Sequence, residues 1–236
     1  MNAGRIFLVP NLLGVVTPAD VLPMRTIEVA RTLAHWVVET PKPARAFLKS
    51  LDSRRPVAEL SIQAIGESPD ASAIGRLLAP ALEGHDLGVL SDAGCPGIAD
   101  PGAMLVAEAH VRGMTVVPLV GPSSVLLALM AAGMNGQRFT FHGYLPVKPD
   151  QRAVALRKLE AESRAQRCTQ LFIETPYRNV TMLASIVATL APATRVCVAA
   201  DLTLPTESVV TRPAKAWRAQ DLGGYAKRPA IFLLEA

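Results

Sequence analysis

The segment from Ser91 to Gly102, SDAGCPGIADPG, limits the fold of this chain more than any other stretch. It follows a short apolar run at 87–90, typical of a buried strand, and precedes a helical pattern at 103–110. The segment is therefore predicted to be a loop at the carboxyl end of a strand, where open α/β sheets place their ligands. Three glycines and two prolines in its twelve residues fix the backbone and allow another molecule to approach it closely.

Two carboxylates, Asp92 and Asp100, lie inside this loop, and two interpretations of it stay open at this point. In the first, the loop is only a turn between strand and helix, with Asp100 as a cap and Pro101 at the first helical position. In the second, the loop binds a ligand. Composition alone favours neither interpretation.

Strands and helices alternate along the whole chain, which predicts an α/β fold with two α/β units. The boundary is expected near residue 120, which gives domains of residues 1–120 and 121–236. Thr26 is the expected cap of the first helix. We expect strands at 5–9, 35–39, 60–65, 87–90, 114–120, 138–146, 170–173, 195–200, 207–211 and 228–235, and helices at 26–33, 44–51, 73–82 (broken at Pro80), 103–112, 125–132, 151–164 and 177–190.

The composition excludes several classes of protein. Half of the 236 residues are hydrophobic, enough for a sizeable core. The three cysteines lie far apart, which argues against a zinc site or a disulfide framework and fits a reducing cytoplasm. The N-terminus shows no signal peptide, and no apolar stretch is long enough to cross a bilayer, so no membrane partner is expected. The net charge of +4 permits nucleic acid as a partner without demanding it.

The sequence lacks the Gly-x-Gly-x-x-Gly fingerprint, the phosphate-binding Gly-Lys-Ser/Thr loop and the His-Glu-x-x-His motif. These absences disfavour nicotinamide, nucleotide-hydrolysing and zinc chemistry. We therefore expect no metal site.

Ser-Asp-Ala-Gly-x-Pro followed by Asp-Pro-Gly resembles the signature loop of the tetrapyrrole methylase superfamily. It most resembles the branch that methylates a ribose 2′-hydroxyl of small-subunit ribosomal RNA. Two further stretches resemble family motifs: the Gly-Pro-Ser turn at 121–124 and the Glu-Thr-Pro-Tyr-Arg turn at 174–178. The resemblance implies two α/β domains of the tetrapyrrole methylase type with a ligand cleft between them. It also implies an S-adenosylmethionine (SAM)-dependent methyltransferase that is cytoplasmic and homodimeric.

The resemblance assigns residues position by position. The predicted SAM contacts are Asp92, Ala93, Gly94, Ile98, Ser123, Ser124, Ile173, Asp201 and Ala230. Asp100 and Glu174 are the candidate general bases, and Arg178 is expected to orient the acceptor. Simpler interpretations stay open: the two serines as caps of the next helix, and Glu174 with Arg178 as a salt bridge that holds the turn.

The chain departs from the RNA branch at three places. The segment after the first strand, Pro10–Gly14, is less glycine-rich, and Glu39-Thr40-Pro41 replaces an Asp-Thr-Arg run. Ala200 and Leu204 stand where the branch has an Arg and a Lys, while Asp201 is kept. Because phosphate contacts supply much of RNA affinity, the lost cations weaken the case for the same ribosomal target.

Three functions are therefore weighed. An RNA ribose is the first choice of methyl acceptor. A tetrapyrrole or another small molecule is the second. The third is a non-catalytic module that binds SAM or RNA, which would bind without turnover.

Overall fold

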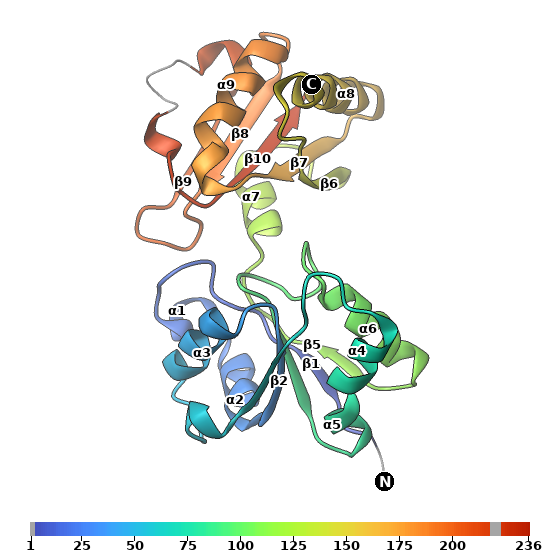
Figure 1. Ribbon diagram of the computed structural model, residues 1–236. Coiled ribbons are helices and arrows are strands. Elements are labelled where there is room, and N and C mark those ends of the chain that lie inside the picture. Colours follow the sequence, from blue (N-terminus) through green and yellow to red (C-terminus); the bar gives the residue numbers. More distant parts are fainter. Residues whose placement is uncertain (1–2, 218–222) are drawn as a thin grey trace. The chain divides into compact units, whose positions relative to one another are not determined.

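The computed structural model describes residues 3–217 and 223–236, and the chain divides into two compact units, Met1–Ser123 and Ser124–Ala236. We call them unit 1 and unit 2. Each is built around one five-stranded sheet (Figure 1).

Unit 1 contains a fully parallel sheet with the strand order β3-β2-β4-β1-β5. Its elements are β1 (Ile6–Leu8), α1 (Pro18–Val21), α2 (Met24–Thr32), β2 (His35–Val38), α3 (Pro41–Ser50), the 3-10 turn η1 (Val57–Glu59), β3 (Ser61–Ala64), α4 (Ala71–Leu77), α5 (Ala79–Leu82), β4 (Leu87–Leu90), α6 (Gly102–Val111) and β5 (Val116–Pro118).

Both faces of this sheet are buried. Successive side chains of a strand point to opposite faces, so neighbouring residues of one strand belong to different cores. Phe7 and Trp36 belong to a core that includes residues of α2 and α3. Ile6 and Val37, their neighbours in sequence, belong to a second core with residues of α4 and α6. The helices therefore cover both faces of the sheet (Figure 1).

Strand β4 lies between β2 and β1. The helix that follows β4 packs on the opposite face of the sheet from the helices that follow β1 and β2. The chain leaves β1 and β2 toward α2 and α3 on one face, whereas it leaves β4 toward α6 on the other. A change of direction between neighbouring strands opens a crevice at their carboxyl ends. The loop at 91–102 lies at this position.

Unit 2 contains a mixed sheet with the order β6-β7-β10-β8-β9. Its elements are α7 (Ser124–Ala132), β6 (Phe139–Tyr144), α8 (Pro149–Gln166), β7 (Thr169–Ile173), the 3-10 turn η2 (Pro176–Arg178), α9 (Asn179–Thr189), β8 (Arg195–Ala200), β9 (Ser208–Pro213), the 3-10 turns η3 (Ala214–Ala216) and η4 (Gly223–Tyr225), and β10 (Ala230–Glu235).

Helices α8 and α9 cover one face of this sheet around Phe172 and Phe232, and α7 contacts β8, β9 and β10. Strand β10 is antiparallel to both β7 and β8. The carboxyl ends of β7 and β8 and the beginning of β10 therefore lie at the same edge of the sheet.

Several local predictions need correction. Thr26 is not the cap of its helix: α2 already begins at Met24, and the Thr26 hydroxyl donates to the carbonyl of Val120 because it lies buried against that segment. The first helical residue of α6 is Gly102, and Pro101 occupies the cap position. Pro80 does break the predicted helix, into α4 and α5. No helix within the described ranges is long and apolar enough to span a membrane.

Candidate active site

Glu39 and Asp92 meet at the carboxyl edge of the unit 1 sheet. The backbone N–H of Asp92 donates to Oε2 of Glu39 at 2.9 Å, and the N–H of Thr40 donates to Oδ1 of Asp92 at 3.1 Å. The loops that follow β2 and β4 are thereby joined through their carboxylates. The Asp92 side chain stays exposed, so it remains accessible to a ligand.

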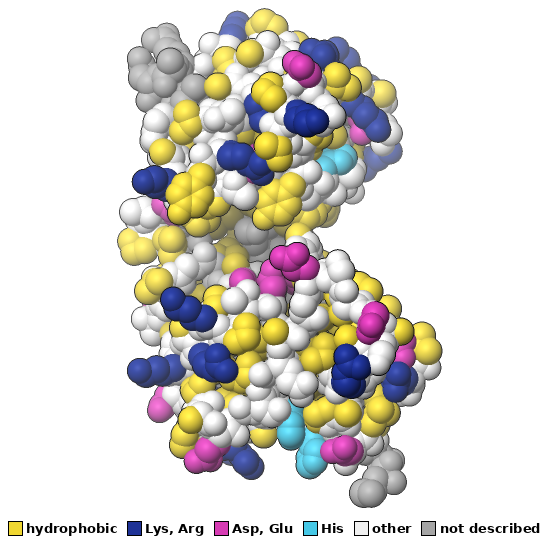
Figure 2. Space-filling model, viewed as in Figure 1, with side chains coloured by type: hydrophobic (Ala, Val, Ile, Leu, Met, Phe, Trp, Pro, Cys, Tyr) yellow, Lys and Arg dark blue, Asp and Glu magenta, His cyan; other side chains and the backbone are white. Residues whose placement is uncertain are grey.

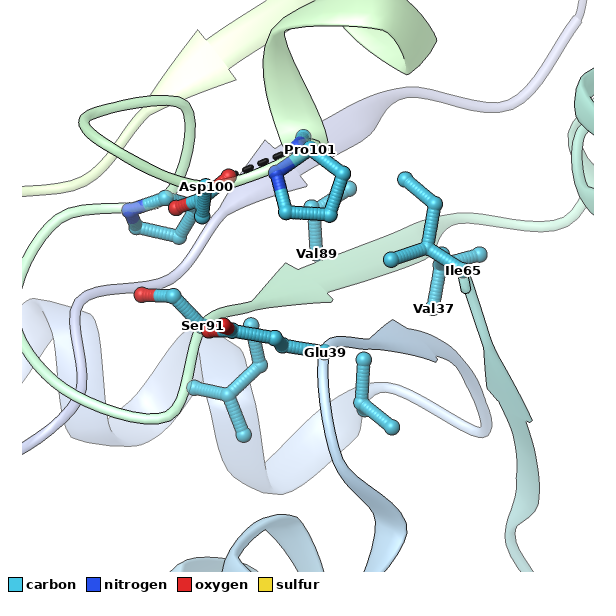
Figure 3. Close-up of a pocket in the computed structure, with 11 residues that line it drawn as sticks. Val37, Glu39, Ile65, Val89, Ser91, Asp100 and Pro101 are labelled. Carbon is cyan, nitrogen blue, oxygen red and sulfur yellow. Dashed lines mark hydrogen bonds between the residues drawn. The ribbon is translucent and has the colours of Figure 1, made fainter. Parts of the chain in front are cut away.

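Asp100 holds the other half of the loop in shape. Its carboxylate accepts hydrogen bonds from the N–H groups of Gly97, at 2.9 Å, and Gly102, at 2.6 Å. Figure 3 draws the bond from Gly102 as a dashed line. A Cβ atom at Gly102 would lie 2.7 Å from Oδ1 of Asp100, so a side chain there would displace this carboxylate. Burial raises the pKa of Asp100, although these backbone N–H groups act to lower it.

Asn11 connects the loop after β1 to the start of the loop at 91–102. Its side-chain amide donates to the carbonyls of Ser91, at 2.9 Å, and Asp92, at 3.0 Å. Its backbone N–H donates to the carbonyl of Gly94, which has a φ of +69°. Glycine adopts this conformation without strain, and the backbone beside Ala93 is thus held in one shape.

Two cavities border this edge. The small one, about 10 Å³, has Glu39, Ser91 and Asp100 in its wall and has room for about one water molecule (Figure 3). The large one, about 330 Å³, lies between the β1–α1 loop, α3 and the beginning of the loop at 91–102. It is lined by Asn11, Leu12, Leu13, Gly14, Val15, Val16, Pro43, Ala46, Phe47, Ser50, Asp92 and Ala93.

The Gly-Pro-Ser turn follows β5 at the same edge. Gly121 packs so tightly that an added Cβ would lie 2.4 Å from Pro10, and the thiol of Cys95 donates to the carbonyl of Pro122 at 3.5 Å. Ser123 is the last residue of unit 1 and is half-buried, while Ser124 begins α7 in unit 2.

In unit 2, Glu174 and Arg178 form the ion pair that the simpler interpretation predicts. Nη2 of Arg178 lies 2.5 Å from Oε1 of Glu174, whose side chain is fully buried, while that of Arg178 is 31% exposed. Oε1 also accepts the N–H of Thr175. Oε2 is buried and has no hydrogen-bond partner among the described residues. Glu174 therefore fixes the position of a guanidinium that still reaches solvent.

Asp201 follows β8 at the edge of the unit 2 sheet where β7 also ends. It pairs with an arginine that the sequence analysis did not single out. Nε of Arg228 donates to Oδ2 of Asp201 at 2.7 Å, and Nη2 donates to the carbonyl of Thr206. Asp201 and Thr203 both have positive φ values, +52° and +71°, which cost energy for residues with a side chain. The buried hydroxyl of Thr203 has no partner among the described residues.

The charge at the unit 1 edge fits SAM, whose sulfonium and α-ammonium groups are cationic. Glu39, Asp92 and Asp100 are all acidic, and Figure 2 shows carboxylates in magenta close together on this end of the unit. Burial raises the pKa of Glu39, and the charges of Asp92 and Asp100 raise it further, against the hydrogen bond from the Asp92 N–H. A cation bound here would relieve this repulsion between carboxylates.

Comparison with known proteins decides the family. The family model for tetrapyrrole (corrin/porphyrin) methylases matches residues 19–216. The chain belongs to the tetrapyrrole methylase family. The predicted fold class and family are thereby confirmed, as are the activity of a methyltransferase and SAM as its methyl donor.

Two relatives are named ribosomal RNA small subunit methyltransferase I. The protein from Escherichia coli is 32% identical over 223 residues, which cover 93% of this chain and 74% of the relative. The protein from Pseudomonas aeruginosa is 31% identical over 213 residues, which cover 90% of this chain and 71% of the relative.

Two solved structures share the fold. The methyltransferase CobJ superposes with a TM-score of 0.64 at 18% identity, covering 100% of this chain and 94% of that one. Cobalt precorrin-4 methyltransferase, CbiF, superposes with a TM-score of 0.61 at 14% identity, covering 98% and 94%.

The structure sorts the predicted site residues into two groups. Those at the unit 1 edge are Asp92, Ala93, Gly94, Ile98, Asp100 and Ser123. Those of unit 2 are Ser124, at the start of α7, and Ile173, Glu174, Arg178, Asp201 and Ala230, at the edge of its sheet. Sequence reasoning missed Asn11 and Arg228 as positioning residues, and it noted Glu39 only as part of a run that departs from the family motif. Their partners are distant in sequence, so no local pattern reveals them.

Proposed function

We propose that this protein transfers a methyl group from SAM to a ribose hydroxyl of RNA. The observation that supports this most is the shaped acidic loop at 91–102, in a chain about one-third identical to methyltransferases named for small-subunit ribosomal RNA. The two solved structures above are 18% identical to this chain or less, so their likeness concerns the fold alone and does not indicate the methyl acceptor.

The charge distribution favours a polyanionic acceptor. Unit 2 carries 14 Lys and Arg residues against 8 Asp and Glu residues, a net charge of +6, while unit 1 carries 10 against 12, a net charge of −2. A basic domain attracts nucleic acid, and an acidic edge attracts the cationic methyl donor.

The unit 1 residues are assigned to SAM. Asp92 would accept the α-ammonium group, and the backbone of Ala93 and Gly94, held by Asn11, would contact the amino-acid tail. Ile98 is 54% exposed, which suits an apolar contact to the cofactor. When bound, SAM supplies an electrophilic methyl group on a sulfonium sulfur. The contacts of Ser123, Ser124, Ile173, Asp201 and Ala230 with SAM stay predictions.

The catalytic residues are assigned from their hydrogen bonds. Asp100 and Glu174 each accept several hydrogen bonds, so we propose that Asp100 shapes the loop and Glu174 positions Arg178. Arg178 would orient the acceptor through its exposed N–H groups. We assign the role of general base to Glu39 instead of Asp100 or Glu174, because its carboxylate is half-buried and has a raised pKa. The cytoplasmic location and the homodimer stay predictions.

A methyl-transfer assay tests the proposal. The protein is incubated with radiolabelled SAM and either deproteinised small-subunit ribosomal RNA or uroporphyrinogen III. The labelled RNA is then hydrolysed with alkali, which cleaves the strand only beside a free ribose 2′-hydroxyl. Label recovered in an alkali-resistant dinucleotide would show that the methyl group lies on a ribose 2′-oxygen. Label only in the tetrapyrrole would overturn the RNA acceptor, and SAM binding without transfer to either would favour the non-catalytic module.

A further inference from the structure

Helix α3 presents three exposed cations on one side. Lys42, Arg45 and Lys49 lie three and four residues apart, which places them in one stripe along the helix. The helix Pro41–Ser50 contains no acidic residue. The stripe extends about 10 Å, since seven residues separate its ends at 1.5 Å each.

The adjacent side of the same helix lines the cavity of about 330 Å³. Pro43, Ala46 and Ser50 lie within 100° of the cation stripe in the helical projection, so the cations border the cavity. Figure 2 shows the cationic side chains in dark blue over the region that α3 occupies in Figure 1. A binding cavity with a basic rim is thus built into unit 1.

The wall of the cavity is mostly apolar. Leu12, Leu13, Val15 and Val16 come from the loop after β1, and Val15 is 99% exposed. Among the described residues that line the cavity, Asp92 is the one that carries a charge. Such a wall disfavours a phosphate inside, because anions would meet a carboxylate and no cation. It suits a flat, uncharged ring that packs against the apolar side chains of the loop after β1.

The cavity suits a ring, and the cations along its rim suit anions. One unstacked nucleotide with its flanking phosphates has both of these groups. Proteins recognise single-stranded RNA by this combination: phosphate contacts position the strand, and a splayed base enters a pocket. We propose that the cavity beside α3 binds a nucleobase of single-stranded RNA, while Lys42, Arg45 and Lys49 bind the adjoining phosphates. This inference rests on the proposed RNA acceptor and assigns its docking surface.

The stripe also bears on the cations missing from the family pattern. Ala200 and Leu204 stand in unit 2 where the family pattern has two cations, whereas α3 carries three cations in unit 1. The phosphate contacts are therefore assigned to a different element of this chain.

The test measures binding of a short fluorescent single-stranded RNA by anisotropy, without SAM, over a range of salt concentrations. The triple variant K42Q/R45Q/K49Q should bind at least about tenfold more weakly at low salt, and its salt slope should fall by about 2, since each lost phosphate contact removes about 0.7. The matched variant R5Q/R76Q/R112Q loses the same charge from exposed positions elsewhere in unit 1 and should stay within about twofold of the wild type. Equal losses in both variants, or none in the first, would overturn the proposal.

A second variant tests the cavity. Ala46→Trp fills it from the exposed side of α3, and should weaken RNA binding while leaving the salt slope unchanged. Thermal unfolding monitored by circular dichroism confirms that each variant is folded. If Ala46→Trp abolishes SAM binding by calorimetry yet leaves RNA binding intact, the cavity belongs to the cofactor and the assignment is wrong.

The last part of the test measures binding of uroporphyrin III, a planar ring with carboxylates, to the wild type and to the triple variant. Binding of this porphyrin through the α3 cations, with no binding of RNA, would overturn both the surface and the RNA acceptor. RNA binding through α3 with no methyl transfer would contradict only the proposed function.

Discussion

The carboxylates of Glu39 and Asp92 each accept a backbone N–H from the loop that carries the other. Oε2 of Glu39 accepts the N–H of Asp92, and Oδ1 of Asp92 accepts the N–H of Thr40. The two loops follow neighbouring strands, β2 and β4. Acidic groups held this close repel one another, so the arrangement favours a bound cation.

Asp92→Ala should weaken SAM binding by about tenfold or more, because a hydrogen-bonded charge pair with the ligand is worth about 1.5–3 kcal/mol. Isothermal titration calorimetry with SAM and with its demethylated product measures this. Asp20→Ala, in the short helix α1, serves as the matched control and should bind normally. Unchanged affinity of the Asp92 variant would remove the loop at 91–102 from the cofactor site.

Stability should depend on pH through Glu39. Burial raises its pKa in the folded protein, so the folded state binds the proton more tightly than the unfolded state. This contribution to the free energy of unfolding is therefore present at low pH and is lost as pH rises from 4.5, the ordinary value, through the raised pKa. Urea unfolding at a series of pH values should show a smaller loss for Glu39→Gln than for the wild type. Parallel pH profiles would contradict the raised pKa.

Gly102→Ala should weaken SAM binding, because its Cβ would lie 2.7 Å from Oδ1 of Asp100 and displace the carboxylate that holds the loop. Gly75→Ala is the matched control: in α4 its Cβ meets only the end of Arg112 at 3.4 Å, and alanine favours a helix interior by up to about 1 kcal/mol. Calorimetry and thermal unfolding should show a loss of SAM affinity only in the first variant.

The sequence predicts this fold well wherever the signal is local. The run Leu87–Leu90 is a strand with the predicted bounds, and Arg195–Ala200 is another. Short apolar runs ended by glycine, proline or aspartate leave few other structures open. The helix at 151–164 is observed at Pro149–Gln166, a difference of two residues at each end.

The side-chain contacts of the site could not be predicted from local sequence patterns. Arg228 reaches Asp201 across 27 positions, and Glu39 reaches Asp92 across 53. Such pairs depend on which strands become neighbours, and neither side chain carries a local pattern that identifies its partner. The resemblance to a family supplied the residues around the loop at 91–102, and the structure supplied their hydrogen bonds.

Arg178→Ala should destabilise the protein by about 3 kcal/mol, because it leaves the buried carboxylate of Glu174 without its cation. Glu174→Gln should cost less, since Arg178 is partly exposed and regains water. In the double variant the two losses should be less than additive, because the charge and its partner leave together. Urea unfolding of the four proteins measures this coupling. Simple additivity would mean that the ion pair contributes nothing.

Asn179→Ala should destabilise unit 2 by about 2 kcal/mol through lost backbone contacts. The Asn179 side chain is fully buried at the start of α9, and its amide donates to the carbonyls of Tyr225, at 3.1 Å, and Arg228, at 2.6 Å. Without these donors, two carbonyls of the segment that leads into β10 lose their partner, and the Arg228 guanidinium loses its support beside Asp201.

Thr181→Ala, on the exposed side of the same helix, is the control for this variant and should be neutral or slightly stabilising, because alanine has the higher helix propensity. Thermal unfolding compares the two. If Asn179→Ala melts with the wild type, the segment around Tyr225 and Arg228 is held by other contacts. If it melts earlier but methylates at the wild-type rate, the Asp201–Arg228 pair serves stability rather than the reaction.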